Sequence, residues 1–423
     1  MSQSVEVVVV GAGLAGLTCA RTLQDHGVGV RVLEAADAVG GRIRTDEVDG
    51  FLLDRGFQLL NPAYPMVRSD VDLDALALQP FRAGLACRSD RSDSLLVMAD
   101  PRREPQLIGQ TMRSGKLHPA ALGSLARWAA PALRADWALH GDREDVSRRE
   151  SMDRANFHGP LRRVVDTFLA GVLLEDDGST STAFTHLLTR MFATGRPGLP
   201  ERGMQALPEQ LAETLHTPVE LGTEVVSVSG GRVRTAGGED IGADLVVVAT
   251  GAEAATALTG RPSAGGKGVT THWYAVEQAP TDLSLLVIDQ REKAGPVINT
   301  AVMSNAAPSY APAGRHLVQA SSLLRPGQDP VADDVVATQL AGIYGVPTDG
   351  WQLLRRDDIR YALPAQPAPL HDREALEVEP GLILAGDHVD TGSIQGAMVS
   401  GRRAAEGFLR RRGDRAAPLA AEA

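Results

Sequence analysis

Glycines and a carboxylate near the start of the chain have the types and spacing that suit a ligand carrying phosphates. Gly11, Gly13 and Gly16 follow a run of four valines and open a helical pattern. Gly11 permits a tight turn after the strand, Gly13 lets the backbone approach a pyrophosphate, and Gly16 lets the helix pack closely against the strand. The start of the helix would offer free N–H groups and the positive end of its dipole to the phosphates. We therefore expect a dinucleotide site at this turn.

An acidic residue lies where the ribose of such a ligand is expected. Glu34 follows a second apolar run, residues 28–33, and lies about 20 residues after Gly13, where the fingerprint places an acid that accepts hydrogen bonds from ribose hydroxyls. A carboxylate there argues against a ribose 2′-phosphate, so NADP is disfavoured as the ligand of this site.

A motif near the C-terminus predicts a second half of the same site. Residues 382–387 read as a strand that ends in Gly386 and Asp387, and another helix begins near Gln395. A dinucleotide that is held by both ends of the chain must be long, which favours FAD over NAD.

The elements that position these motifs must come together from distant segments. Residues 219–251 read as strands again, and residues 380–412 return to a strand and a helix. We therefore expect an α/β fold with a discontinuous, Rossmann-like FAD-binding domain and an inserted α+β substrate-binding domain. The reactive end of the cofactor would point into the crevice between them. The expected segments are 1–60, 219–262 and 375–412 for FAD, 61–218 and 263–374 for substrate, and 413–423 as a flexible tail.

The first inserted segment, residues 61–215, is mainly helical in pattern. Within it, Leu122, Leu125, Ala129 and Ala132 recur at helical spacing with arginines nearby. Such a helix can rest on a membrane surface, and a peripheral membrane contact stays open. We favour the other interpretation, an amphipathic helix that packs inside the substrate-binding domain.

Composition narrows the classes of function. The net charge of −11 argues against a general nucleic-acid surface. Cys19 and Cys87 are the only cysteines and form no C-x-x-C pair, so we expect no redox dithiol and no metal site. The sequence contains no run of about 18 apolar residues, so we expect no membrane span. The first apolar run is a strand with no basic segment before it, so we expect no signal peptide and a cytoplasmic location.

Taken together, these residues resemble the FAD-dependent flavin amine oxidase superfamily, which includes monoamine and polyamine oxidases, protoporphyrinogen oxidase and phytoene-desaturase-like enzymes. The turn with Glu34 is similar to its ADP-binding turn, and Gly40, Gly41 and Arg42 resemble its second glycine motif. The resemblance implies a FAD-binding domain of the glutathione-reductase type. Further matching segments are residues 53–58 beside the flavin, residues 203–208 in a "GM..LP" turn, Val225 at the adenine, and residues 386–387 and 395–397 in the C-terminal flavin motif.

The resemblance implies a set of cofactor contacts. Arg42 offers a forked cation to the pyrophosphate, and Asp387 can accept hydrogen bonds from ribityl or ribose hydroxyls. The helix near Gln395 can direct N–H groups at the pyrimidine end of the flavin, where negative charge develops on reduction. No cysteine lies near this motif, so we expect non-covalent FAD. The expected residues are Gly11, Gly13, Leu14, Ala15, Gly16, Glu34, Ala35, Gly40, Gly41, Arg42, Gly56, Phe57, Gln58, Val225, Gly386, Asp387, Ile394 and Gln395.

The expected function is that of an FAD-dependent oxidoreductase, an oxidase or a desaturase. An apolar or amine substrate would give a hydride from a C–H bond to flavin N5, and oxygen or a quinone would act as the external acceptor. A flavin-assisted isomerase and a non-enzymatic FAD-binding protein are the alternatives. Arg42 and the C-terminal motif disfavour an NAD-dependent dehydrogenase.

Amine oxidases of this superfamily usually have an aromatic cage and often a lysine near flavin N5. Tyr361 can form one side of a cage, but residues 391–393, where the second aromatic would stand, are Thr, Gly and Ser. Lys267 and Lys293 are candidates for the lysine. The ionisable side chains that we consider as bases in the pocket are Tyr361, His388 and His272.

Overall fold

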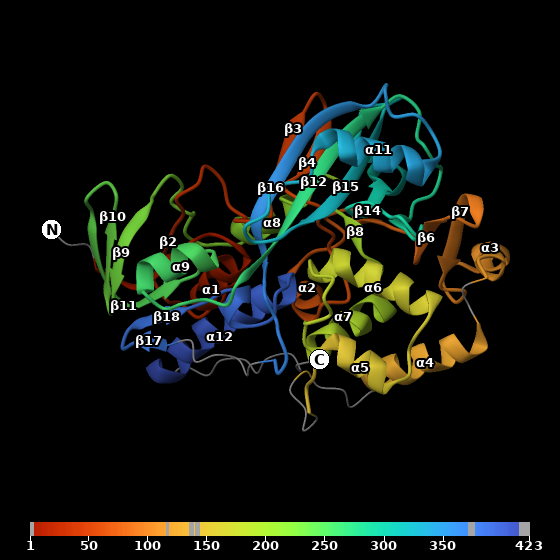
Figure 1. Cartoon of the computed structure of the whole chain (residues 1–423). Helices are drawn as coiled ribbons and strands as arrows, with labels where there is room; N and C mark the ends of the chain where they lie inside the picture. Colours follow the sequence, from red (N-terminus) through yellow and green to blue (C-terminus); the bar gives the residue numbers. More distant parts are fainter. Residues whose placement is uncertain (1–3, 116–117, 135–138, 140–143, 371–376, 414–423) are drawn as a thin grey trace.

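The computed structural model describes residues 4–115, 118–134, 139, 144–370 and 377–413. Two seven-stranded sheets organise these residues and lie on opposite sides of the molecule (Figure 1). The first sheet contains the first and the last strands of the described chain, and all strands of the second lie between them in the sequence. The expected mixed α/β architecture is confirmed. The exact division into domain segments stays a prediction, and residues 414–423 of the expected tail lie outside the described residues.

The first sheet is parallel at its centre. β1 pairs with β2 on one side and with β11 on the other, and β18 pairs with β11. Parallel strands are typically covered on both faces, and the four consecutive valines of β1, residues 7–10, are accordingly buried, at most 3% exposed. These strands are β1 (Ser4–Val10), β2 (Val30–Leu33), β11 (Asp240–Val248) and β18 (Leu382–Leu384), with β17 (Glu377–Glu379) at the edge.

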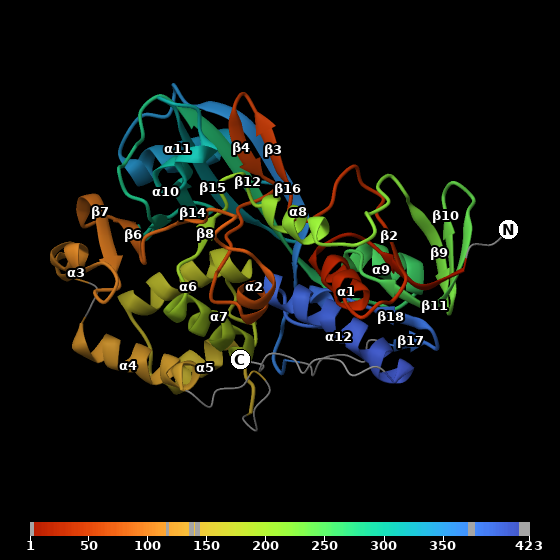
Figure 2. The same ribbon diagram turned by 180° about the vertical axis from the view of Figure 1, so that it is seen from behind.

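Two helices from the opposite ends of the chain pack on one face of this sheet, beside each other (Figure 2). They are α1 (Leu14–Gln24) and α12 (Ile394–Arg412). Their approach requires small residues, because a Cβ on Gly401 would lie 2.0 Å from the backbone oxygen of Ala15. The other face is covered by α9 (Ala252–Thr259) and by the hairpin of β9 (Val225–Ser229) and β10 (Arg232–Thr235). β10 also pairs antiparallel with β11, so the hairpin supplies the two remaining strands of this sheet.

The second sheet is antiparallel apart from one parallel pair, β6 with β13. Its order is β16 (Gln352–Pro364), β12 (Gly266–Val276), β15 (His316–Leu324), β14 (Val297–Val302), β13 (Leu286–Asp289), β6 (Gly84–Ser89) and β7 (Ser92–Ala99). Residues 61–215 are mainly helical, as expected, but they also include the strands β6 and β7. β6 and β7 pair with each other as a local hairpin, and β6 also pairs with β13, about 200 residues later in the chain. A local pattern cannot reveal this second pairing, which joins the hairpin to the sheet.

Helices cover both faces of the second sheet. α11 (Asp333–Tyr344) packs on one face. α6 (Pro160–Leu173) and α7 (Thr182–Thr194) lie on the other face, and α4 and α5 lie beyond them (Figure 1). The remaining helices are α2 (Pro65–Asp70), α3 (Ile108–Arg113), α4 (Pro119–Ala129), α5 (Arg148–Arg154), α8 (Ala206–Glu213) and α10 (Met303–Ala306). The remaining strands pair as β3 (Thr45–Val48) with β4 (Phe51–Asp54) and β5 (Gln79–Pro80) with β8 (Gly198–Leu199).

The helix expected around residues 117–134 is α4, followed by a short 3-10 turn, Ala130–Leu133. Trp128 and Ala132 are buried, so one side of this helix packs inside the protein, but Leu122, which the pattern placed on the same side as Ala132, does not belong to it. Leu122 and Leu133 remain exposed on the other side, at 40% and 52%. No described helix combines the length and the apolar character needed to cross a bilayer.

Candidate functional site

A cavity of about 1040 Å³ lies between the two halves of the fold and takes its walls from both sheets. Its volume is at the upper end of the usual range for ligand pockets, about 300–1,000 Å³. One part of the wall is formed where β1, β2, β11 and β18 end and where α1 and α12 begin. Ligands of open parallel sheets bind at these carboxyl ends. We call this part the motif end of the cavity.

The first glycine turn forms the floor of the motif end. Gly11 has a φ of +100°, and a Cβ there would lie 2.9 Å from the backbone oxygen of Ala249. A Cβ on Gly16 would lie 2.0 Å from the oxygen of Gly11, so α1 approaches the strand closely. Gly13 has open space on its Cβ side and is the N-cap of α1, without a side-chain cap. The first N–H groups of α1 therefore stand beside the cavity with no capping side chain.

Glu34 closes the same turn. Its two carboxylate oxygens accept hydrogen bonds from the N–H groups of Ala12, at 2.7 Å, and Ala36, at 2.9 Å. The side chain also lines the cavity. Since each carboxylate oxygen has a second acceptor site, Glu34 can hold the turn and still accept a hydrogen bond from a ligand.

Arg42 connects the second glycine motif to the C-terminal motif. Its guanidinium donates to Asp387 Oδ1 at 2.5 Å and to the backbone oxygen of Ala362 at 2.7 Å. Burial opposes the charged guanidinium, but the Asp387 carboxylate more than offsets it and raises the pKa of Arg42 above its usual value. Arg42 and Asp387 both line the cavity. Residues more than 340 positions apart thus form one charged pair in its wall.

The start of α12 forms the adjoining wall. Ser393 is its N-cap and accepts a hydrogen bond from the N–H of Gly396 at 3.0 Å. A Cβ on Gly396 would lie 2.0 Å from the backbone oxygen of Thr391, so the turn leaves no room for a side chain. Ser393 and Ile394 line the cavity. The C-terminal sequence motif predicted the helix that begins here, but it did not identify Ser393 as its N-cap.

Most of the sequence-predicted cofactor residues come together in this wall, and two do not line it. Gly16 lies behind the turn, and Gln395 is buried with its Oε1 accepting a hydrogen bond from the N–H of Met66 at 2.9 Å. The sequence-predicted cofactor residues that do line the cavity are Gly11, Gly13, Leu14, Ala15, Glu34, Ala35, Gly40, Gly41, Arg42, Gly56, Phe57, Gln58, Val225, Gly386, Asp387 and Ile394.

The three proposed bases lie outside this lining, and the structure explains why. Tyr361 packs its ring over Gly266 and donates to the oxygen of Ala264 at 3.4 Å. The His388 ring lies against Gly386. His272 lies on the α11 face of β12, with Nε2 3.0 Å from Asp333 Oδ1, because neighbouring residues of a strand point to opposite faces. Burial lowers the pKa of His272. The sequence identified chemically suitable residues but not the direction of their side chains.

The two lysine candidates also lie outside the lining. Lys267 Nζ donates to Thr180 Oγ1 at 2.9 Å, and Lys293 is exposed in a loop. Neither therefore faces the cavity in the way that a lysine beside a flavin would.

A buried carboxylate that sequence analysis did not single out joins three of the motifs. Asp54 accepts hydrogen bonds from Thr45 Oγ1 at 2.6 Å, from the N–H of Met204 at 3.0 Å and from the hydroxyl of Tyr310 at 3.0 Å. Burial raises the pKa of Asp54 to about 6, and the three hydrogen bonds oppose that shift. Asp54 thus holds the segments around residues 40–45, 53–58 and 203–208 together beside the cavity.

The wall that is contributed by α6, α7 and the second sheet has a different chemistry, and we call it the substrate end. Among the described residues that α6, α7 and the second sheet contribute to this wall, Ser321 is the only one whose side chain carries a hydrogen-bonding group, and none is charged. Its lining residues are Gly171, Val172, Leu174, Leu188, Met191, Phe192, Pro197, Val269, Ser321, Ile359, Ala362 and Leu363. Asn61 and Tyr64, from the loop before α2, line the cavity as neighbouring neutral polar residues.

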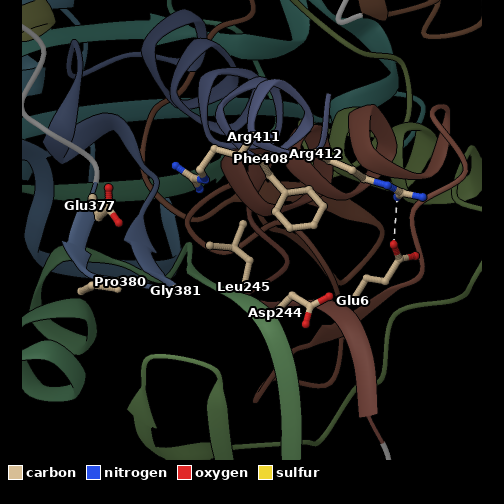
Figure 3. A pocket seen from close by; sticks show the side chains of 9 residues that line it. All are labelled: Glu6, Asp244, Leu245, Glu377, Pro380, Gly381, Phe408, Arg411 and Arg412. Atoms are coloured by element: carbon tan, nitrogen blue, oxygen red, sulfur yellow. Dashed lines mark ion pairs between the residues drawn. The ribbon is translucent and has the colours of Figure 1, made fainter. Parts of the chain in front are cut away.

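A second hollow, of about 490 Å³, lies at the opposite edge of the first sheet (Figure 3). It includes Glu6 near the start of β1 and Arg412 at the end of α12, which form an ion pair at 2.9 Å. This edge holds the amino ends of the strands, away from the glycine turn and the first turn of α1. The motif residues therefore assign the functional site to the larger cavity.

Comparison with known proteins identifies the family to which the chain is similar. The model of a family described as flavin containing amine oxidoreductase matches residues 14–408. Putrescine oxidase of Kocuria rosea is 30% identical over 249 residues, which are 52% of this chain and 47% of that protein. The match therefore spans about half the length of this curated relative.

Solved structures show the same fold. A structure of putrescine oxidase bound to putrescine has a TM-score of 0.70 at 18% identity and covers 97% of this chain and 100% of its own. A fatty acid isomerase from P. acnes has a TM-score of 0.68 at 16% identity and covers 97% and 99%. At these identities the likeness concerns the fold alone.

Proposed function

Since the chain belongs to the flavin-containing amine oxidoreductase family, we propose that it is an FAD-dependent oxidoreductase, an oxidase or a desaturase. It would oxidise a C–H bond of a small molecule and pass the electrons to an external acceptor, oxygen or a quinone. The observation that carries this proposal is the motif end of the cavity, where both ends of the chain supply the groups that a flavin dinucleotide needs.

The residues present fit FAD. Gly13 leaves open space before the uncapped start of α1, which suits a pyrophosphate. Arg42 is the forked cation beside that space, and Glu34 and Asp387 are acceptors for ribose and ribityl hydroxyls. Val225 lines the part of the wall where the adenine would lie. Neither cysteine lines the cavity, which supports non-covalent binding.

Bound FAD would supply the hydride acceptor. The chain's own contribution is position and electrostatics. Among the described residues that line the cavity there is no histidine, lysine or cysteine. The first turn of α12 directs its dipole into the cavity and can stabilise negative charge there. The apolar wall excludes water and orients the reacting C–H bond.

The two alternatives, a flavin-assisted isomerase and a non-enzymatic FAD-binding protein, would use the same cavity. Unlike the proposed oxidoreductase, neither would pass electrons from a substrate to an external acceptor. The decisive experiment is an anaerobic screen of the purified protein against amines, porphyrinogens and polyene or terpenoid hydrocarbons, followed by flavin absorbance. We expect at least one of the neutral compounds to bleach the flavin and oxygen or a quinone to restore it. Product formation without bleaching would support the isomerase, and no effect of any compound would support the non-enzymatic alternative.

A peripheral membrane contact forms a separate part of the proposal. The exposed residues of α4 and the turn after it lie on one side of the helix and are Pro119, Ala120, Leu122, Gly123, Ala126, Arg127, Ala130, Leu133 and Arg134. Residues 105–134 contain no aspartate or glutamate, although the whole chain has a net charge of −11. An apolar surface that carries only positive charge suits an anionic lipid surface. The cytoplasmic location that the sequence suggests stays a prediction.

A further inference from the structure

We infer that the substrate end of the cavity takes an uncharged, largely hydrocarbon molecule whose one polar group donates a hydrogen bond to Ser321 Oγ. This inference rests on the proposed function, because it assigns the flavin to the motif end. It narrows the substrate class, since it excludes amines that are protonated at neutral pH.

The first support is the absence of a counter-charge. None of the described residues in the wall of the substrate end is charged. An ammonium group that enters such a wall loses its hydration and gains no partner, which is strongly unfavourable. The aliphatic and aromatic side chains of this wall favour a hydrocarbon instead.

Charged residues that adjoin this wall in the sequence are paired elsewhere. Glu175 follows Leu174, but its carboxylate pairs with the buried Arg148 at 3.2 Å and accepts the N–H of Gly178 at 2.6 Å. Lys267 lies two residues before Val269 and donates to Thr180. Burial also lowers the pKa of the Lys267 amine. These groups therefore offer no free charge to a ligand.

A chain of hydrogen bonds determines which hydrogen bond Ser321 Oγ donates and which it accepts. Ser321 Oγ donates to Gln319 Oε1 at 3.1 Å, and Gln319 Nε2 donates to Asn299 Oδ1 at 3.1 Å. Thr271 Oγ1 lies 3.3 Å from Ser321 Oγ. Because the single hydroxyl proton of Ser321 goes to Gln319, Thr271 is the donor in that pair. One acceptor site of Ser321 Oγ is left for a ligand, so a hydroxyl fits better than an ether or a ketone.

The test uses the FAD-loaded protein and follows ligand binding by the visible absorption spectrum of the flavin, without turnover. The probes are octanol, decanol, dodecanol, decyl methyl ether and decylamine at pH 7. We expect affinity for the alcohols to rise roughly fourfold per added methylene. Decylamine should bind at least about tenfold more weakly than decanol, and the ether about fivefold more weakly, for one lost hydrogen bond.

Two pairs of variants separate the causes. Ser321→Ala should remove the difference between decanol and its ether, whereas Ser322→Ala, on the opposite face of β15, should keep it. Val172→Asp should raise the affinity for decylamine above that for decanol, and Val172→Asn should not. Val172 is only partly buried, so both variants are expected to fold.

Tighter binding of decylamine than of decanol by the unmodified protein would overturn the inference. An unchanged preference for decanol over the ether in Ser321→Ala, or binding of none of the probes, would also overturn it. A protein that takes up no FAD would instead contradict the proposed function. The same probes would then be followed by displacement of a solvatochromic naphthalene dye, with the same expected order.

Discussion

At the scale of single residues, carboxylates do two different tasks around the cavity. Glu34 and Asp387 face the ligand space, and each is also bonded to the protein. Asp54 faces inward and connects three segments of the chain. Substitution of a carboxylate that faces the ligand should change the affinity for the ligand, whereas substitution of Asp54 should change the free energy of unfolding.

For Glu34, we predict that Glu34→Ala weakens FAD binding about ten- to a hundredfold, because one charge-assisted hydrogen bond contributes about 1.5–3 kcal/mol. Part of that loss comes from the turn, whose N–H groups at Ala12 and Ala36 lose their acceptor. Isothermal titration of the apoprotein with FAD measures the dissociation constant.

The matched control is Glu6→Ala. Glu6 accepts a backbone N–H, that of Gly29, at 2.7 Å on the same sheet but at the far edge. Its loss should leave the FAD affinity unchanged. Equal dissociation constants for Glu34→Ala and the unmodified protein would place the adenosine elsewhere.

For Asp54, we predict a pH-dependent stability difference between the unmodified protein and Asp54→Asn. Burial raises the pKa of Asp54 from 3.8 to about 6 in the folded state, so folding favours the neutral acid. Its stabilising contribution is complete below about pH 4 and is lost as the pH rises through about 6. The free energy of unfolding, measured in urea from pH 4 to 8, should fall by roughly 3 kcal/mol relative to the variant. A difference that is constant or grows with pH would contradict this assignment.

At the scale of elements, the first turn of α12 is the part of the fold that the proposed chemistry depends on most. We predict that Gly396→Val lowers both FAD retention and the rate of flavin reduction, because a Cβ there would meet the backbone of Thr391 at 2.0 Å. Rapid mixing with a reducing substrate measures the rate, and gel filtration followed by absorbance measures retention. Gly407→Val on the same helix has open space and serves as the control. Equal behaviour of the two variants would exclude the proposed role of this turn.

The outward side of α4 is the second element that makes a testable claim. We predict that the combined change Leu122→Glu and Leu133→Glu abolishes co-sedimentation with vesicles that contain anionic lipid. Two exposed leucines and two arginines are worth only a few kcal/mol of membrane affinity together, so two added acids should be enough. Val335→Glu, at a side chain 43% exposed on α11, is the control. Binding that survives the double change, or that is equal on neutral vesicles, would argue against this surface.

At the scale of the whole molecule, the sequence motifs predicted the motif end of the cavity well, because short spacings determine it. Gly16 and Glu34 are explained by contacts with the glycine turn itself, at Gly11 and Ala12. Gly11 is explained by its close approach to Ala249, which follows the neighbouring strand β11. The pairing of Arg42 with Asp387 was not predicted, although both residues were singled out.

The substrate end was beyond sequence reasoning for a physical reason. Ser321 and Val172 come from distant segments, and their side-chain directions depend on strand register and helix packing across the second sheet. The same dependence explains why Tyr361, His388 and His272, whose side chains could act as bases, do not line the cavity.

The central claim is that the ends of this chain form one site for non-covalent FAD. The most direct measurement is denaturation of the purified protein, followed by chromatographic and mass-spectrometric identification of the released chromophore. The account predicts a yellow protein that releases intact FAD, with about one molecule per chain and none left attached to the polypeptide. A colourless protein that gains no flavin on incubation with FAD would contradict it.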